Sequence, residues 1–154
     1  MHFKKSNDNQ STILHEGSVP YLTFKKLDQA GVRHGFSTRM GGVSEGMFST
    51  LNLSYNRGDK KEAVDENFRR ISEAIGFDHT KLVFSNQIHE TRIHKVTKED
   101  CGKVMKDMDG LATNEQGIPL YTGYADCVPL FFYDPVEKAC LLYTSPSPRD
   151  GATS

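Results

Sequence analysis

The sequence predicts a domain of mixed α and β structure, and two observations indicate it. Apolar side chains recur at helical spacing between Asp59 and Gly76. On both sides of this helix lie short apolar runs bounded by glycine, proline or small polar residues, which is typical of strands. Several strands with one clear helix indicate a mixed α and β domain. The length of 154 residues is that of a single domain, so we expect one core.

The helix is the best defined of these elements. Four apolar residues form its expected buried stripe: Val64, Phe68, Ile71 and Ile75. Asp59 and Glu62 resemble a capping pair at its start, and Gly76 suits the position just past its last turn. Three polar residues fall between the apolar positions and are expected on a solvated face: Asn67, Arg69 and Arg70.

The strand-like runs are spread over the rest of the chain. They cover residues 19–24, 32–38, 82–84, 92–96, 109–113, 118–122 and 128–133. Residues 1–18 are polar and lack periodicity, so we expect a flexible leader and a first ordered stretch at Val19–Phe24. The last run and the turn after it require a partner strand.

Composition excludes several classes of partner. A hydrophobic content of 36%, a charged content of 25% and a net charge of -1 give no positive field that would attract nucleic acid or anionic lipid. No apolar stretch has the length of a membrane span, and the start of the chain has no apolar signal core. Cys101, Cys127 and Cys140 form no even, closely spaced framework, which fits a reducing compartment. We therefore expect a cytoplasmic protein without nucleic acid or membrane partners.

The end of the chain differs from the rest. Residues 140–150 resemble one reading frame of the transposase adapter used to make sequencing libraries. Such a segment is excluded from fold reasoning, so we expect the domain to cover residues 19–139 and a non-native tail to cover 140–154. The alternative is a strand that fades into a Ser/Pro-rich disordered tail. A non-native tail would pack poorly or only imitate a strand through residues 141–143, and residues 128–133 would then keep an unpaired apolar edge.

Two residues stand at places suited to chemistry. Cys127 lies in a polar turn that leads into the most apolar run of the chain, where a thiol can be a packed small side chain, a nucleophile or a metal ligand. His89 follows a short apolar run and can be a metal ligand, a general base or a surface histidine. The residues alone leave these alternatives open.

A glycine-rich stretch offers a third candidate. Gly41 and Gly42 let backbone N–H groups approach a ligand, and Arg39 beside them can form a fork on a phosphate or carboxylate. The same residues also fit a tight turn next to a solvated arginine.

Five motifs occur together in one order: Thr38–Gly46, Leu51–Leu53, Asn86–His89, Asp109–Gly110 and Ala125–Pro129. In order and spacing, residues 32–139 resemble the laccase-domain family, also called the multicopper polyphenol oxidase or YfiH-like family. The resemblance implies an α+β fold, namely a mixed-sheet α/β sandwich of the YfiH-like type that is incomplete here at its C-terminus.

The resemblance also implies an activity. Family members are described as zinc-dependent purine nucleoside phosphorylases that convert adenosine, inosine and methylthioadenosine to a free base and a sugar 1-phosphate, with some adenosine deaminase activity. An older label of the family names copper. The implied partners are a purine nucleoside and phosphate, and the motifs carry no information on oligomeric state.

Site residues follow from the same resemblance. The implied zinc ligands are His89 and Cys127, and a third ligand would come from a later His-Ala-Gly-Trp-Arg-Gly segment that has no counterpart here. A catalytic zinc usually takes three protein ligands, so we expect the chain to be inactive as it stands. The catalytic set is Cys127, His89 and Arg39. The implied substrate-binding residues are Arg39, Gly41 and Gly42 for phosphate, Asn52 and Gln87 for the nucleoside, and Asp126 for the base or the metal shell.

Two other functions remain open. In a cysteine hydrolase, Cys127 would be the nucleophile and a histidine its base. In a non-catalytic binding or structural fragment, the glycines would form turns and Cys127 would belong to the core.

Overall fold

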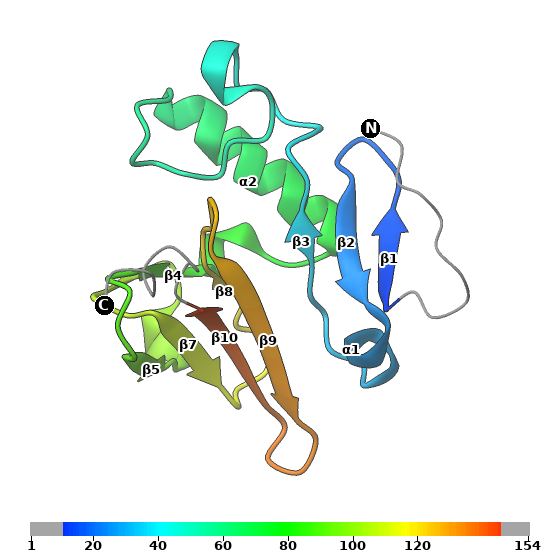
Figure 1. Ribbon diagram of the computed structural model, residues 1–154, viewed down its shortest axis with the longest axis vertical. Coiled ribbons are helices and arrows are strands. Elements are labelled where there is room, and N and C mark those ends of the chain that lie inside the picture. Colours follow the sequence, from blue (N-terminus) through cyan, green and yellow to red (C-terminus); the bar gives the residue numbers. More distant parts are fainter. Residues whose placement is uncertain (1–10, 146–154) are drawn as a thin grey trace, which may run out of the picture. The chain divides into compact units, whose positions relative to one another are not determined.

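The computed structural model describes residues 11–145, which divide into two compact units at the boundary between Gly76 and Phe77 (Figure 1). Each unit has its own cluster of buried apolar side chains, where the sequence predicted one core. Val19, Leu51 and Ile71 form the cluster of the first unit. The cluster of the second unit consists of Val83, Val96, Leu111 and Ile118.

The first unit combines a small antiparallel sheet with one long helix. Its elements are β1 (Thr12–His15), β2 (Tyr21–Phe24), α1 (Lys25–Gln29), β3 (Phe36–Ser37), the 3-10 turn η1 (Gly46–Phe48) and α2 (Lys61–Ile75). The sheet order is β1-β2-β3. Between β3 and α2 runs a long connection that contains the glycine-rich stretch.

Strand β1 lies inside the predicted flexible leader, which is therefore wrong for Thr12–His15. This strand pairs with β2 along its whole length, from Thr12 opposite Phe24 to His15 opposite Tyr21. The rings of His15 and Tyr21 are stacked, with centroids 4.5 Å apart. Pairing with a later strand orders a segment whose own sequence has no periodic pattern. Residues 1–10 of the predicted leader lie outside the described residues.

Helix α2 lies within the predicted range, but its first turn is not capped as predicted. Val64, Phe68 and Ile71 are buried, which confirms the apolar stripe. Gly76 has a φ of 89° and ends the helix in the left-handed conformation that glycine favours. The predicted capping pair is wrong, because the residue before the helix is Lys60 and no side chain caps the first turn.

The second unit contains two sheets. Its strands are β4 (Val83–Asn86), β5 (Ile93–Lys95), β6 (Val104–Lys106), β7 (Gly110–Thr113), β8 (Leu120–Tyr121), β9 (Val128–Asp134) and β10 (Ala139–Ser145). Two 3-10 turns, η2 (His79–Lys81) and η3 (Lys98–Asp100), lie between them. One sheet has the order β5-β7-β10-β9 and the other the order β6-β4-β8. This mixed α and β architecture with separate sheets confirms the predicted fold class.

Strand β10 is the partner that the run at 128–133 required. It forms a long hairpin with β9, in register from Ala139 opposite Asp134 to Ser145 opposite Val128 (Figure 1). On its other side, β10 pairs with β7 from Cys140 to Tyr143. The prediction of an unpaired β9 is therefore wrong on one side, because the segment after Ala139 forms a full strand. The origin of that segment stays a prediction, and residues 146–154 lie outside the described residues.

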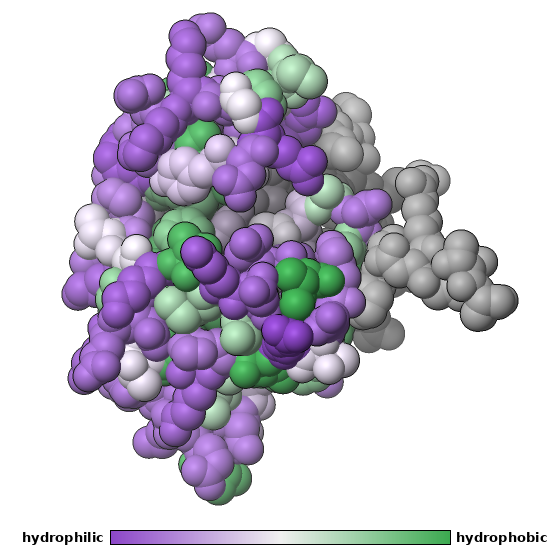
Figure 2. Space-filling view, turned by 90° about the vertical axis from the view of Figure 1, so that its left-hand side faces the viewer, coloured by the Kyte–Doolittle hydropathy of each residue, from purple (hydrophilic) through white to green (hydrophobic). Residues whose placement is uncertain are grey.

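Several large apolar side chains of the described residues are exposed, and Met47 and Val136 are the most exposed of them. Figure 2 shows a face that is mostly hydrophilic, with apolar residues scattered over it. Within residues 11–145, no helix is long and apolar enough to cross a membrane.

Candidate functional site

The second unit brings two of the predicted metal ligands together. Cys127 comes directly before β9, and His89 lies in the loop that follows β4. The Cys127 Sγ and the His89 Nδ1 are 4.0 Å apart. His89 is exposed and Cys127 is half-buried, so both donor atoms belong to an accessible surface and Cys127 is not a fully packed core thiol.

This pair fits two corners of a tetrahedral zinc site. Zinc–sulfur and zinc–nitrogen bonds of the usual lengths place the two donor atoms roughly 3.6 Å apart. A thiolate with an imidazole is also a donor set that suits zinc. Across the part of the chain that the structure describes, no group of three or more His, Cys, Asp or Glu side chains is arranged to hold a metal ion. The pair therefore provides two ligands.

The loop that carries His89 is tied to Asp109. The Asp109 carboxylate accepts hydrogen bonds from the backbone N–H groups of Ile88, His89 and Glu90, at 2.9, 2.7 and 2.9 Å. Asp109 is 0% exposed. The sequence predicts no role for Asp109 beyond its place in a motif. Its position in the Asp109–Gly110 motif was the available signal, and the contact with a loop twenty residues earlier was not visible.

Gln87 links the same loop to the turn before Cys127. Its side-chain Nε2 donates to the carbonyl oxygen of Gly123 at 2.9 Å. Asp126 is exposed beside Cys127. Nearby, burial raises the pKa of the Tyr124 phenol above its usual value of 10.0, so this group stays protonated at neutral pH. The turn before Cys127 thus offers a neutral hydroxyl and an exposed carboxylate.

The other predicted substrate residues lie in the first unit. Gly41 and Gly42 are packed against backbone: a Cβ on Gly41 would collide with Ser18, and one on Gly42 would collide with Thr50. The N–H of Gly42 donates to the Thr50 hydroxyl at 3.3 Å. Close backbone approach therefore explains why glycine stands at both positions, whatever the loop binds.

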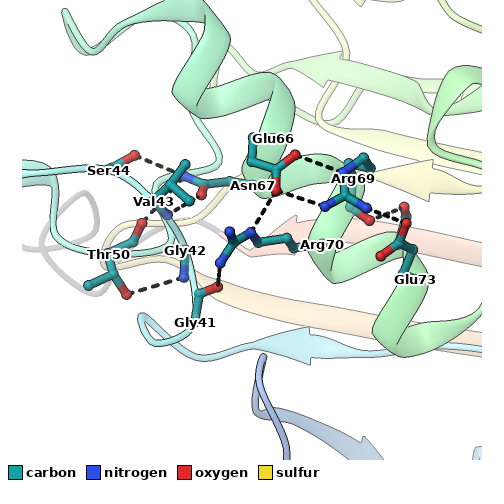
Figure 3. A network of polar contacts seen from close by, with 11 residues as sticks. Gly41, Gly42, Val43, Ser44, Thr50, Glu66, Asn67, Arg69, Arg70 and Glu73 are labelled. Carbon is teal, nitrogen blue, oxygen red and sulfur yellow. Dashed lines mark hydrogen bonds and ion pairs between the residues drawn. The ribbon is translucent and has the colours of Figure 1, made fainter.

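Helix α2 holds this glycine-rich loop through Asn67 (Figure 3). The predicted solvated position is wrong, because Asn67 is 0% exposed. Its Oδ1 accepts from the Val43 N–H at 2.8 Å, and its Nδ2 donates at 2.8 Å to the Ser44 hydroxyl and to the Asn52 carbonyl. A buried amide with both ends hydrogen-bonded is a structural connection, which an apolar periodicity does not reveal.

A second helix residue adds to this connection. Arg70 forms an ion pair with Glu66 at 2.8 Å and donates to the Gly41 carbonyl at 3.3 Å (Figure 3). The two remaining predicted substrate residues of the first unit, Arg39 and Asn52, have other partners. Arg39 is exposed and donates to the Ser49 carbonyl at 2.8 Å, and the Asn52 amide donates to the Asp59 carboxylate at 2.9 Å.

The predicted site residues therefore form two sets. Cys127, His89, Gln87 and Asp126 belong to the second unit, whereas Arg39, Gly41, Gly42 and Asn52 belong to the first. The residues of the first unit lie in the connection between β3 and α2, and those of the second unit lie in the loop after β4 and in the turn before β9.

Comparison with known proteins shows one consistent family. Residues 33–142 match the family model described as multi-copper polyphenol oxidoreductase laccase. The chain is 42% identical over 111 residues to purine nucleoside phosphorylase YlmD of Bacillus subtilis, covering 68% of this chain and 40% of that protein. It is 39% identical over 110 residues to purine nucleoside phosphorylase LACC1 of Mus musculus, covering 70% of this chain and 25% of that protein.

Solved structures give the same result for the fold. The crystal structure of YlmD from Geobacillus stearothermophilus superposes with a TM-score of 0.81 at 33% identity, over 87% of this chain and 52% of that one. The structure of the Bacillus licheniformis protein YfiH superposes with a TM-score of 0.76 at 34% identity, over 81% and 49%. The chain thus spans about half the length of these proteins, and less of the curated relatives.

Proposed function

The chain belongs to the multi-copper polyphenol oxidoreductase laccase family, and from this premise we propose that it is part of a zinc-dependent purine nucleoside phosphorylase. The names of its relatives support this activity. The proposed substrates are adenosine, inosine and methylthioadenosine, with adenosine deamination as a further activity. In phosphorolysis, a phosphate oxygen bonds to C1′ of the sugar while the bond from C1′ to the purine nitrogen breaks and its electron pair leaves with the base.

The observation that carries the proposal is the 4.0 Å approach of Cys127 Sγ to His89 Nδ1. When bound there, zinc would supply Lewis acidity to the reacting groups. Thiolate and imidazole favour zinc over the harder metals that prefer oxygen ligands. The described residues provide two ligands, so we propose that this chain binds zinc weakly and is inactive as it stands, whereas a chain that adds a third ligand would be active.

We assign phosphate binding to Arg39 and the backbone around Gly41 and Gly42. The Arg39 guanidinium is exposed, and such a group can form a fork on an oxyanion. Asn52 and Gln87 are proposed to orient the nucleoside, although the structure also gives each amide a partner within the protein. Asp126, exposed beside Cys127, is proposed to contact the base or the metal shell.

The same approach of thiol and imidazole supports a second candidate, a cysteine hydrolase. There, the His89 imidazole would accept the proton of the Cys127 thiol, and the thiolate would attack an ester or amide carbonyl. This candidate needs no metal, and that separates it from the phosphorylase.

Zinc content and base release test both candidates. The purified chain and its His89→Ala and Cys127→Ser variants are assayed for bound zinc and for hypoxanthine release from inosine with inorganic phosphate. Cys101→Ala is the control, because this thiol packs against the core cluster of the second unit. The phosphorylase predicts zinc binding that falls in both ligand variants and stays in the control.

Other outcomes contradict the phosphorylase. Metal-free hydrolysis of a thiol-reactive ester that disappears in Cys127→Ser would favour the cysteine hydrolase. If the chain shows no zinc binding, no base release and no ester hydrolysis, the result favours a non-catalytic binding or structural fragment.

A further inference from the structure

The carboxylate of Asp109 lies at the centre of the loop that carries His89. Asp109 comes directly before β7, and both its backbone groups are hydrogen-bonded: its N–H donates to the Arg92 carbonyl at 2.9 Å, and its carbonyl accepts from the Thr144 N–H at 3.0 Å. A carboxylate that is 0% exposed needs hydrogen-bond donors around it. Three successive N–H groups, those of Ile88, His89 and Glu90, provide them.

These three N–H groups form a concave anion site made of backbone. Successive N–H groups converge on one point when the chain takes a turn with a left-handed residue. His89 is that residue, with a φ of 62°, in a left-handed conformation that is uncommon for residues other than glycine and that asparagine, aspartate and histidine adopt most often among them. The Asp109 carboxylate is the anion that occupies the site, so the backbone conformation of His89 depends on it.

The two ends of the loop are fixed as well. Before His89, the Gln87 side chain donates to the Gly123 carbonyl at 2.9 Å. After it, the Tyr143 hydroxyl donates to the Glu90 carbonyl at 2.9 Å. Asp109 is the only one of these three anchors that contacts the backbone of His89 itself.

We propose that Asp109 is a positioning residue for His89: it holds the backbone that presents the imidazole to the Cys127 thiol. This inference rests on the proposed function, in which the imidazole is a zinc ligand. Both carboxylate oxygens of Asp109 accept backbone N–H groups, so the carboxylate acts through the backbone of His89 and not as a ligand or base. Mutation of residues that orient metal ligands through hydrogen bonds commonly lowers metal affinity about 10- to 100-fold.

The test compares Asp109→Asn with Asp109→Ala in the full chain. Asparagine keeps one oxygen, which can still accept from Ile88 and His89, but its amide N–H₂ opposes the Glu90 N–H. Thr113→Val on β7 is the matched control, because it removes a buried hydroxyl that donates to Val96 and touches nothing in the His89 loop. All variants are first compared for amide dispersion by NMR, which shows whether they fold.

Two readouts follow the loop without any metal. Amide hydrogen exchange at residues 88–90 should rise at least tenfold in Asp109→Asn and further in Asp109→Ala, but not in Thr113→Val. The NOE between the His89 ring and the Cys127 β-protons should be present in the wild-type chain and weaken in both Asp109 variants. Unchanged exchange and an unchanged NOE would overturn the proposal.

A third readout connects the loop with the metal. Co²⁺ alone is titrated as a probe of the zinc site, and its thiolate charge-transfer band reports binding to Cys127. We expect about 10- to 100-fold weaker binding in Asp109→Asn and wild-type binding in Thr113→Val. Faster amide hydrogen exchange at residues 88–90 with an unchanged Co²⁺ affinity would overturn the positioning role. If the wild-type chain does not bind Co²⁺, the zinc site fails, while the NOE still decides whether Asp109 positions His89.

Tyr143→Phe serves as a second variant if the Asp109 variants do not fold. It removes only the contact with the Glu90 carbonyl. Exchange at Glu90 should then rise and Co²⁺ binding should weaken less than tenfold. No change in either measurement would show that anchoring of this loop does not set the position of His89.

Discussion

At the residue scale, hydrogen-bonded polar side chains of this protein connect segments that are far apart in the sequence. Asn67 connects α2 with the glycine-rich loop, and Asp59 accepts hydrogen bonds from Ser44 at 2.6 Å and from Asn52 at 2.9 Å. Both residues are satisfied by partners on other segments. Asn67 lies in α2 and Asp59 lies just before it. Replacing either residue should therefore disturb the glycine-rich loop more than the helix.

Asn67→Ala is expected to destabilise the protein by on the order of 3 kcal/mol. The change removes part-buried hydrogen bonds to the Val43 N–H and the Asn52 carbonyl, and an orphan group that water does not reach costs about 1–3 kcal/mol. Chemical denaturation measures the loss. Arg69→Ala, two positions on in the same helix but exposed, is the control and should cost much less, because water screens its ion pairs. Equal losses in both variants would contradict a structural role for the Asn67 amide.

Asp59 predicts a dependence of stability on pH. Hydrogen bonds from Asn52, Ser44 and the Lys60 backbone lower the pKa of this carboxyl below its usual 3.8. A carboxyl whose pKa is lowered by folding stabilises the folded state above the unfolded pKa, and that contribution is lost as pH falls through the folded pKa. Stability should therefore fall below about pH 4. In Asp59→Asn the fall should be smaller, and an identical acid profile of both proteins would exclude the contribution of Asp59.

At the element scale, local sequence patterns predicted the elements better than their connections. The apolar stripe of α2 and its terminal Gly76 were predictable because they depend on spacing and on a left-handed φ within the helix itself. The start of the helix was not, because the Asp59 carboxylate is taken by Ser44 and Asn52 instead of the first turn. Strand β1 is not predictable from its own sequence for a similar reason, because pairing with β2 is what makes this segment a strand.

The candidate site divides in the same way. The motifs predict Cys127 and His89 as a pair, and the structure places Sγ of one 4.0 Å from Nδ1 of the other, while their role as metal ligands stays a prediction. The role of Asp109 is not predictable from its motif, because a buried carboxylate and an exposed one look the same in a single sequence. The contacts that give Asp109 and Asn67 their roles span about twenty positions or more, where no local periodicity operates.

The glycine-rich loop gives a prediction for an element packed against backbone. In Gly42→Ala, the new Cβ would meet the Thr50 carbonyl and the Leu51 backbone, which cannot move aside as a flexible side chain can. We expect a loss of about 1–3 kcal/mol or more, measured by thermal or chemical unfolding. Gly17→Ala is the control, because nothing lies within 4 Å of its Cβ position and its φ is not in the left-handed region. A neutral Gly42→Ala would show that the loop has room for a side chain.

At the scale of the whole molecule, β9 is the longest of the described strands that lie at the edge of a sheet. The sheet order β5-β7-β10-β9 leaves β9 with one neighbour, and Phe132 and Val128 are 52% and 50% exposed. Strand edges with apolar side chains pair readily with other strands.

Self-association through β9 is therefore expected for the chain as it stands. Sedimentation velocity over a range of concentrations should show a growing share of dimer or larger species, because two β9 edges can pair in an antiparallel way. Phe132→Lys places a charge on that edge and should shift the protein towards monomer. Val136→Lys adds the same charge in the hairpin turn after β9, at a residue that is 83% exposed, and should leave association unchanged. Equal effects of both variants would mean that net charge, and not the β9 edge, controls association.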